Sequence, residues 1–216
     1  MEWIGRVPAH WQIARTKHVA RLRTGHTPSR RHPEYWENCT IPWFGLTDVH
    51  QIRDGTAEYV EKTAELISEL GLANSAAELL PKGTVMLSRT ASVGFSAIMG
   101  REMATTQDFA NWVCGPRLRP EFLLYVFRGM TQEFHRLTMG STHQTIYMPD
   151  IAAFVTPLPP LEEQDKIVAF VRERVSGLLG LRRSIWDAIS RLREYRAALI
   201  TAAVTGQIDV GAEVDS

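Results

Sequence analysis

Apolar residues recur at alternating intervals of three and four through the last quarter of the chain. The mean interval of about 3.5 residues is the coiled-coil repeat, and it predicts one long helix over 161–203 with an apolar stripe. At about 1.5 Å per residue this helix would measure about 65 Å. Arg182 and Arg196 occupy two places in the stripe. Its apolar members are Val168, Val171, Val175, Leu178, Ile185, Ile189, Leu192, Leu199 and Ala203.

The stretch PLPPLEEQDKI, residues 157–167, separates this helix from what precedes it. The prolines predict a rigid start, and Glu162 and Glu163 place negative charge in the first turn, where the helix dipole favours it. Gly177 and Gly180 each weaken the middle of the helix by about 1 kcal/mol relative to alanine, which leaves room for a bend.

The pattern divides the chain into a globular head at 1–158, the long helix at 159–206 and a tail at 207–216. The head contains no second apolar repeat of comparable length. The stripe therefore needs a partner, either another helix or a second copy of this chain. We expect the proline run to be the joint between the head and a coiled-coil arm.

The head alternates between strand-like and helix-like patterns, which predicts an α/β (α+β) fold. Strands rich in β-branched and aromatic residues are predicted at 83–89, 95–99 and 111–118. A short helix is predicted at 63–71, with Gly71 as its C-terminal cap. A longer amphipathic helix is predicted at 120–140, beginning at Pro120 and ending at Gly140.

Composition agrees with a globular protein, at 44% hydrophobic and 22% charged residues. No window of 18 consecutive apolar residues is present, so no membrane span is expected. The first residues lack the basic-then-apolar order of a signal peptide. Cys39 and Cys114 stand far apart in apolar surroundings, which favours buried thiols in a reducing compartment over a metal site. These features together predict a cytoplasmic protein.

Positive charge is concentrated at one end of a chain whose formal net charge is +0. Residues 1–31 contain seven lysines or arginines against Glu2 alone. Such a segment fits a localised face that contacts phosphate groups. A solvated basic surface without a ligand explains the same pattern equally well.

Catalytic patterns are missing from the sequence. It contains no P-loop, no dinucleotide-binding glycine pattern, no H-E-x-x-H and no G-x-S-x-G. The Asn/Asp-Pro-Pro-aromatic tetrapeptide of amino-methyltransferases is also absent. Ser92 and Ser141 have no neighbouring base in sequence that would activate a nucleophile. A catalytic role is therefore not expected.

Three polar loops instead carry recognition chemistry: RTGHTPSRR, SRTASVG and GSTHQT. Serine and threonine bind phosphate oxygens or base edges, glutamine can pair with adenine, and arginine is the commonest reader of guanine. A capped turn or an internally bonded loop is the alternative for each. The candidate DNA-contacting residues are Arg21, Arg23, Thr24, His26, Thr27, Ser29, Arg30, Arg31, Arg89, Thr90, Ser92, Gln107, Ser141, Thr142, His143, Gln144 and Thr145.

The chain resembles the DNA-specificity subunit of type I restriction-modification systems. The resemblance rests on EWIGRVPAHW, RTGHTPSR, IPWFGLTDV, LLPKGTVMLSRTASVG, TTQDF, GSTHQTI, PLPPLEEQDKI and LREYRAALITAAVTGQIDV. It implies a target recognition domain followed by a long conserved helix. In full-size members this unit occurs twice and the two helices pack as an antiparallel coiled coil. One unit alone fits either a half-size subunit or the C-terminal half of a longer one.

The resemblance also implies a division of labour. The specificity subunit binds double-stranded DNA without catalysing a reaction, while methyltransferase and restriction subunits hold S-adenosylmethionine, Mg²⁺ and ATP. This chain would need no cofactor, would self-associate through the long helix and would have no membrane partner. Motifs shared between members with different targets cannot set the target. Base-reading residues are therefore expected in 26–39, 50–62, 100–119 and 141–147.

Two other interpretations remain open at the level of sequence. The chain could be a coiled-coil scaffold whose head does not read DNA, and the basic residues 1–31 argue against this. It could also be a small DNA-modifying enzyme with an unfamiliar site, which the missing motifs disfavour. A gel-shift assay and a methyl-transfer assay on the isolated chain would separate the three interpretations.

Overall fold

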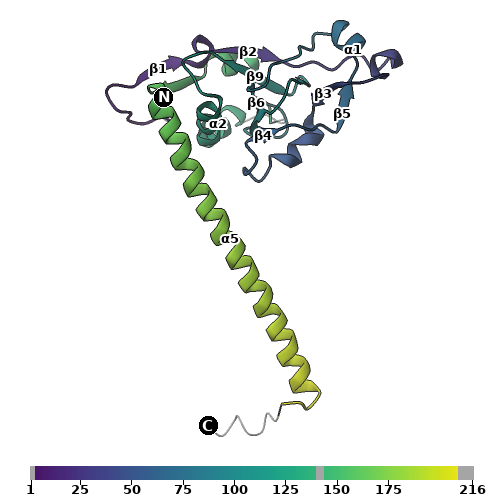
Figure 1. Cartoon of the computed structure of the whole chain (residues 1–216), viewed down its shortest axis with the longest axis vertical. Coiled ribbons are helices and arrows are strands. Elements are labelled where there is room, and N and C mark those ends of the chain that lie inside the picture. Colours follow the sequence, from purple (N-terminus) through teal and green to yellow (C-terminus); the bar gives the residue numbers. More distant parts are fainter. Residues whose placement is uncertain (1–2, 140–143, 209–216) are drawn as a thin grey trace. The chain divides into compact units, whose positions relative to one another are not determined.

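The protein is described by a computed structural model that covers residues 3–139 and 144–208 (Figure 1). The chain forms two compact units, 1–168 and 169–216. The strands are β1 Gln12–Arg15, β2 Ala20–Thr24, β3 Ile41–Phe44, β4 Tyr59–Val60, β5 Glu65–Ile67, β6 Val85–Ser88, β7 Ser96–Met99, β8 Ala104–Thr105, β9 Phe109–Cys114 and β10 Val155–Leu158. The α-helices are α1 Glu69–Ala73, α2 Pro120–Gly129, α3 Thr131–Thr138, α4 Met148–Ala152 and α5 Leu161–Val204. Short 3₁₀ helices span Thr16–His18, Pro33–Trp36 and Leu46–Gln51.

The described strands of the head form three sheets. A five-stranded sheet has the order β2-β9-β6-β7-β4, and a three-stranded sheet has the order β5-β3-β8. β1 and β10 pair antiparallel, with Gln12 opposite Leu158. This last pair brings the beginning of the chain beside the proline run that precedes α5.

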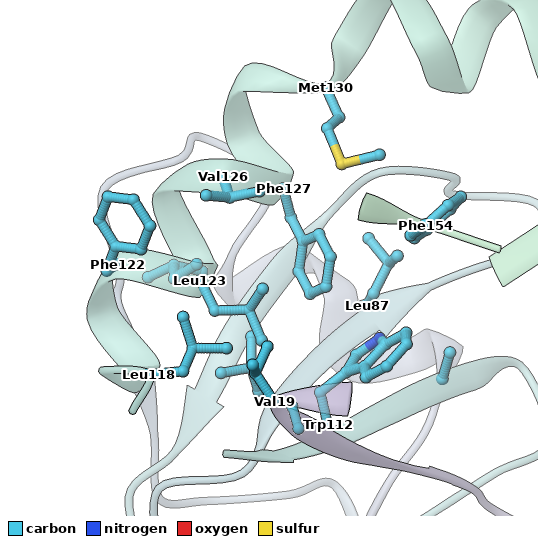
Figure 2. Packing of buried hydrophobic residues seen from close by; sticks show 14 of the residues in the cluster. Val19, Leu87, Trp112, Leu118, Phe122, Leu123, Val126, Phe127, Met130 and Phe154 are labelled. Atoms are coloured by element: carbon cyan, nitrogen blue, oxygen red, sulfur yellow. The ribbon is translucent and has the colours of Figure 1, made fainter. Parts of the chain in front are cut away.

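Successive side chains of the five-stranded sheet point to opposite faces, so its strands contribute to two separate cores. Val85 and Leu87 point into a core shared with α2 and α3, whereas Met86 points into a second core on the other face. Figure 2 shows Trp112 of β9 and Phe127 of α2 meeting in the first core, with ring centroids 6.2 Å apart. Because both faces are covered, the strands read as nearly continuous apolar runs, which is why they could be predicted from sequence.

The predicted helix over 120–140 is wrong as a single element. It divides into α2 and α3 at Met130, whose ψ of 16° departs from helical geometry. The break lets both Phe127 and Phe134 pack against Phe154, at centroid distances of 6.4 and 5.9 Å. The predicted end at Gly140 lies outside the described residues.

The predicted helix over 63–71 is also wrong. Glu65–Ile67 forms β5 and pairs with β3, so tertiary pairing overrides the helical composition. Ser68 then caps α1 by accepting a hydrogen bond from the Gly71 amide at 3.0 Å. Gly71 therefore lies inside α1 and does not cap it. A Cβ there would come within 2.7 Å of the Tyr35 carbonyl oxygen, which explains the glycine.

The prediction of a long C-terminal helix is confirmed by α5, which is uninterrupted at Gly177 and Gly180. Its first two turns belong to the compact unit of the head, which ends at Val168. Val168 is only 6% exposed and packs in the head core. Its placement in the apolar pairing stripe is therefore wrong. The remaining described part of α5, from Ala169 onward, forms the second unit.

Gln164 explains why PLPPLEEQDKI begins a helix so abruptly. Its fully buried side chain accepts a hydrogen bond from the Arg119 amide at 2.8 Å. It donates two more, to the carbonyl oxygens of Arg117 and Pro159, each at 2.9 Å. One amide thus satisfies three backbone groups from the loop before α2 and the proline run, and it fixes the start of α5 on the head.

The neighbours of Gln164 add two charged contacts. Glu163 accepts a hydrogen bond from the Trp11 indole at 2.8 Å and lies 2.8 Å from His10 Nε2. The indole contact, followed by His10, lowers the pKa of Glu163. Asp165 receives two hydrogen bonds from the Arg119 guanidinium, at 2.9 and 3.1 Å. Glu163 and Asp165 therefore each have a partner in the head, and Glu163 also lies in the first turn, where the helix dipole favours its charge.

Replacing Gln164 with leucine should destabilise the head by about 3 kcal/mol, because three buried backbone groups lose their partner and each orphan costs about 1–3 kcal/mol. Urea unfolding followed by tryptophan fluorescence in a Trp186→Phe background would measure this in the head. Lys166→Ala, an exposed change in the same turn, is the control and should be nearly neutral. We call the three hydrogen bonds of the Gln164 side chain the clamp. Equal stability of the two variants would show that the clamp does not stabilise the head.

Candidate nucleic-acid interface

Four of the polar sequence motifs meet at one end of the five-stranded sheet. β9 pairs antiparallel with both β2 and β6, so Thr24 lies opposite Ala110 and Ser88 opposite Phe109. The loops that follow β2 and β6 and the turn that precedes β9 therefore emerge together. We call the segments 24–31, 88–94, 105–108 and 144–146 the motif cluster.

Hydrogen bonds link the segments of the motif cluster across large sequence separations. Thr27 donates from Oγ1 to the Gln107 side chain at 2.7 Å. Arg89 donates from Nε to the Gln107 carbonyl oxygen at 2.9 Å and from Nη1 to the Ile146 carbonyl oxygen at 3.5 Å. Thr90 and Thr145 form an isolated β-bridge. The guanidinium of Arg89 is thus occupied in joining two loops.

Gly25 allows the first of these loops to cross the sheet end. A Cβ at this position would lie 2.1 Å from the Thr105 carbonyl oxygen and 2.2 Å from its hydroxyl. The next residue, His26, donates its backbone N–H to that same carbonyl at 3.0 Å. The glycine of the RTGHT motif is therefore required by close backbone approach.

The turn after β6 contains a strained residue. Ala91 has a φ of 58°, in the left-handed region that residues with a Cβ rarely adopt. Its backbone N–H donates to the Gln144 carbonyl oxygen at 2.9 Å, which holds it in place. Strain of this kind persists where surrounding contacts enforce it, and it is commoner at functional sites.

Arg30 lies in a box of aromatic and acidic side chains. Its guanidinium stacks on Trp36, 3.5 Å from the ring centroid, and donates to the Glu65 carboxylate. Trp36 packs edge-on against Trp43, with centroids 5.4 Å apart, and the Trp43 indole donates to the His26 carbonyl oxygen at 3.1 Å. This Arg30 box fastens the loop after β2 to the three-stranded sheet.

The motif cluster presents a mixed set of hydrogen-bonding groups to solvent. Thr27, Arg89, Thr90 and Ser92 are partly buried. The exposed side chains are those of His26, Ser29, Arg31, Gln107 and Gln144. Ser141, Thr142 and His143 of the GSTHQT motif lie outside the described residues. The described part of the cluster can therefore offer donors and acceptors to phosphate oxygens and base edges.

The basic residues of 1–31 do not gather on one face. Arg30 and Arg31 belong to the motif cluster, whereas Lys17 and Arg21 line a groove near the opposite end of β2 and β9. Arg23 pairs with Glu78 at 3.2 Å. The basic residues of 1–31 were expected to form one surface that contacts phosphate. They instead lie at opposite ends of β2.

Two of the segments expected to read bases are held by the fold. Eight of the twenty residues 100–119 form β8 and β9, and ten are buried and cannot reach a base, so the expectation is wrong for these ten. The exposed positions are Arg101, Glu102, Gln107, Pro116, Arg117 and Arg119. The segment 50–62 is fastened to α2, because Arg128 donates to the carbonyl oxygens of Gly55 and Ala57 at 2.8 and 2.6 Å. Burial lowers the pKa of Arg128.

Sequence reasoning missed the Arg30 box and the role of Gly25. Trp36, Trp43 and Glu65 come from three different elements, and no local pattern joins them. Gly25 inside a polar loop was a visible sign of close packing. The residue it packs against, Thr105, is 80 positions away in the sequence. Contacts of this range depend on strand pairing that sequence alone does not specify.

Nothing in the described residues 3–139 and 144–208 resembles a metal centre, since no three His, Cys, Asp or Glu side chains converge. Within the same ranges no helix is long and apolar enough to cross a bilayer. Cys39 and Cys114 are free and half-buried, whereas full burial was expected. Burial and then the charge of Glu121 raise the pKa of the Cys114 thiol to about 12, so it is protonated at neutral pH.

Solved structures share this fold. The HsdS subunit from Thermoanaerobacter tengcongensis superposes with a TM-score of 0.63 at 22% identity, over 83% of this chain and 41% of that chain. A chain from a type I R-M system, reported for its complex assembly and conformational transition, superposes with a TM-score of 0.72 at 21% identity. That match covers 92% of this chain and 47% of the other. These matches confirm the predicted fold class of a mixed α/β head followed by a long helix.

Curated relatives point to a family. The type I restriction enzyme MjaIX specificity subunit of Methanocaldococcus jannaschii is 28% identical over 166 residues, covering 76% of this chain and 38% of that protein. The type I restriction enzyme EcoprrI specificity subunit of Escherichia coli is 24% identical over 161 residues, covering 73% and 39%. The chain spans about two fifths of the length of these relatives.

The family described as "Type I restriction modification DNA specificity domain" matches residues 8–178. The match includes the motif cluster, the clamp around Gln164 and the first turns of α5. Relatives of this chain are named as specificity subunits of type I restriction enzymes, and the predicted family is confirmed. The chain therefore belongs to the family of type I restriction-modification DNA specificity domains.

Proposed function

We propose that this chain reads one half of a split DNA target and directs the methyltransferase and restriction subunits of a type I system to it. The observation that carries the proposal is the convergence of four motif segments in the motif cluster, where hydrogen bonds fix their backbones. Preorganised loops lose little conformational entropy when they bind, which favours recognition of a rigid duplex.

Within the motif cluster the proposal separates two kinds of residue. Arg30 and Arg89 are occupied by internal partners and shape the loops. Arg31, Ser29 and His26 are exposed and are assigned to phosphate and groove contacts. Gln107 and Gln144 have the amide groups suited to base edges. S-adenosylmethionine, Mg²⁺ and ATP would be held by partner subunits, and this chain would act in the cytoplasm.

The second unit is proposed to pair with a second copy of itself. Leu178 and Leu192 of the stripe are 66% and 67% exposed in the single chain. Trp186, Tyr195 and Leu181 flank the stripe and are more than half exposed as well. An isolated helix gains most of its stability from burying an apolar face, so this face requires a partner.

Charge in the stripe favours an antiparallel pair. In a parallel pair in register, Arg182 and Arg196 would each face their own copies in the seam. Antiparallel pairing about the centre of the exposed stripe, which runs from Val171 to Ala203, places Arg182 level with Leu192 of the second copy and Arg196 level with Leu178. Like charges are then separated along the seam, which avoids a costly repulsion in a low-dielectric environment. The exposed apolar residues that flank the stripe would remain available to bind the methyltransferase subunit.

Arg31→Ala should weaken binding to all DNA sequences alike and reduce the slope of log K against log[salt] by about 0.9, since one phosphate contact is lost. Arg30→Ala should leave that slope unchanged and lower stability, because it empties the Arg30 box. Electrophoretic shifts across a salt series with random duplex would measure both. Identical salt slopes in Arg31→Ala and the unmodified chain would remove Arg31 from the interface.

Ile185→Glu and Leu192→Glu should each convert the paired protein to a monomer, because a charge in the seam costs several kcal/mol. Sedimentation at tens of micromolar would record the change. Glu173→Gln, an exposed polar position on the same helix, is the matched control and should leave the pair intact. A monomeric unmodified chain would contradict self-pairing.

The assembled complex should methylate a split inverted repeat, because a two-fold protein demands two identical half-sites. One additional base pair in the spacer rotates one half-site by about 34° and should abolish recognition. Sequencing of methylated adenines in a host with the complete system provides the motif. A continuous site would count against the proposal, and two unrelated halves would mean that this unit works within a longer subunit. A chain that pairs but binds no DNA would favour a scaffold role.

A further inference from the structure

A basic groove lies at the end of the five-stranded sheet opposite the motif cluster. Its volume is about 760 Å³, and its rim carries the exposed side chains of Lys17, His18, Arg21 and Arg117. Val19 and Leu22 contribute apolar surface, and among residues 3–139 and 144–208 no acidic residue lines the groove. We call this feature the basic groove.

The sheet separates the basic groove from the motif cluster. Ala20 pairs with Cys114 at the groove, whereas Thr24 pairs with Ala110 at the motif cluster. Four residues of strand span about 13 Å. β2 is also the edge strand of its sheet, and an edge strand can receive an additional extended segment. The groove therefore has the form of a separate site for an acidic, partly apolar segment of chain.

The groove adjoins the start of α5. The carbonyl oxygen of Arg117 accepts the hydrogen bond from Gln164 in the first turn of that helix. The Arg117 guanidinium donates to the Gln12 side chain at 2.6 Å. In a paired assembly, a segment of the second copy that lies beside the first turn of α5 would therefore be close to the Arg117 end of the groove.

Antiparallel pairing would bring a specific segment to this place. Centring the exposed stripe, from Val171 to Ala203, puts Ala203 of one copy level with Val171 of the other, about 11 Å along the helix from Gln164. Gly206, with a φ of 69°, turns the chain, and Ile208 donates its backbone N–H to the Ala202 carbonyl oxygen at 3.3 Å. The segment that follows Ile208 therefore starts beside the last turn of α5. Residues 209–216 read DVGAEVDS, with three acidic residues, two valines and no basic residue. Eight extended residues reach at most about 28 Å. The segment has the charge and the reach that the basic groove demands.

We propose that residues 209–216 of one copy bind the basic groove of a second copy. Asp209, Glu213 and Asp215 would pair with the rim cations, and the valines would cover the apolar wall. This inference rests on the proposed antiparallel self-pairing. It adds a second contact at each end of the pair, and that contact fixes the alignment of the two helices. Because it is largely ionic and exposed, it weakens as salt rises.

The first test measures the dissociation constant of the pair by sedimentation equilibrium. A chain ending at Ile208 should pair about tenfold more weakly, as expected for a few exposed ion pairs acting together. Lys17→Glu with Arg117→Glu should have a similar effect, and combining it with the truncation should add nothing further. Lys82→Glu with Arg101→Glu makes the same charge change at exposed positions away from the groove and should be neutral.

The second test detects the contact directly. In a background without Cys39 and Cys114, a tagged Lys17→Cys chain is mixed with a Val214→Cys chain and oxidised. A disulfide between the two chains is the expected product, and Lys82→Cys in place of Lys17→Cys should give none. A pair that forms normally after truncation and gives no cross-link would overturn this inference while self-pairing stands. A monomeric unmodified chain would overturn both, and charge reversal that weakens only DNA binding would assign the groove to phosphate.

Discussion

The architecture of this chain depends on one buried amide. Gln164 bonds three backbone groups that no regular element satisfies, and these groups belong to the proline run and the loop that leads into α2. Glu163 and Asp165 reinforce the same junction with contacts to Trp11 and Arg119. A helix of 44 residues therefore starts from a junction built of directional bonds, which tolerate little change in geometry. The apolar cores alone would leave that junction loosely defined.

A comparable constraint shapes the motif cluster. Its loops are joined by hydrogen bonds between side chains and backbone carbonyls, and Gly25 and Ala91 adopt conformations or contacts that few residues permit. The apolar sheet supplies the framework, while polar bonds determine where each loop stands. Residues that fix the loops and residues that face solvent alternate along the same short motifs.

Sequence reasoning succeeded where the pattern was local. The repeat in α5 and the apolar runs of β6, β7 and β9 follow from composition and period. It failed where tertiary contacts decided the outcome, as in the break at Met130 and the strand at Glu65–Ile67. Val168 has the period of the exposed stripe, yet its burial depends on the surface that lies against it. The polar loops could be recognised singly, but their convergence depends on strand register across about 80 residues.

The Arg30 box has a consequence for engineering new specificities. The loop after β2 is held by Trp43 of β3 and Glu65 of β5, neither of which belongs to the loop. A loop transplanted alone into a relative would lose the surfaces against which Trp36 and Arg30 pack. Without these contacts the loop would be flexible, and its exposed side chains would not be held in fixed positions. A portable cassette therefore needs at least 24–68, and its acceptor must keep Thr105 and Gln107, which bond His26 and Thr27.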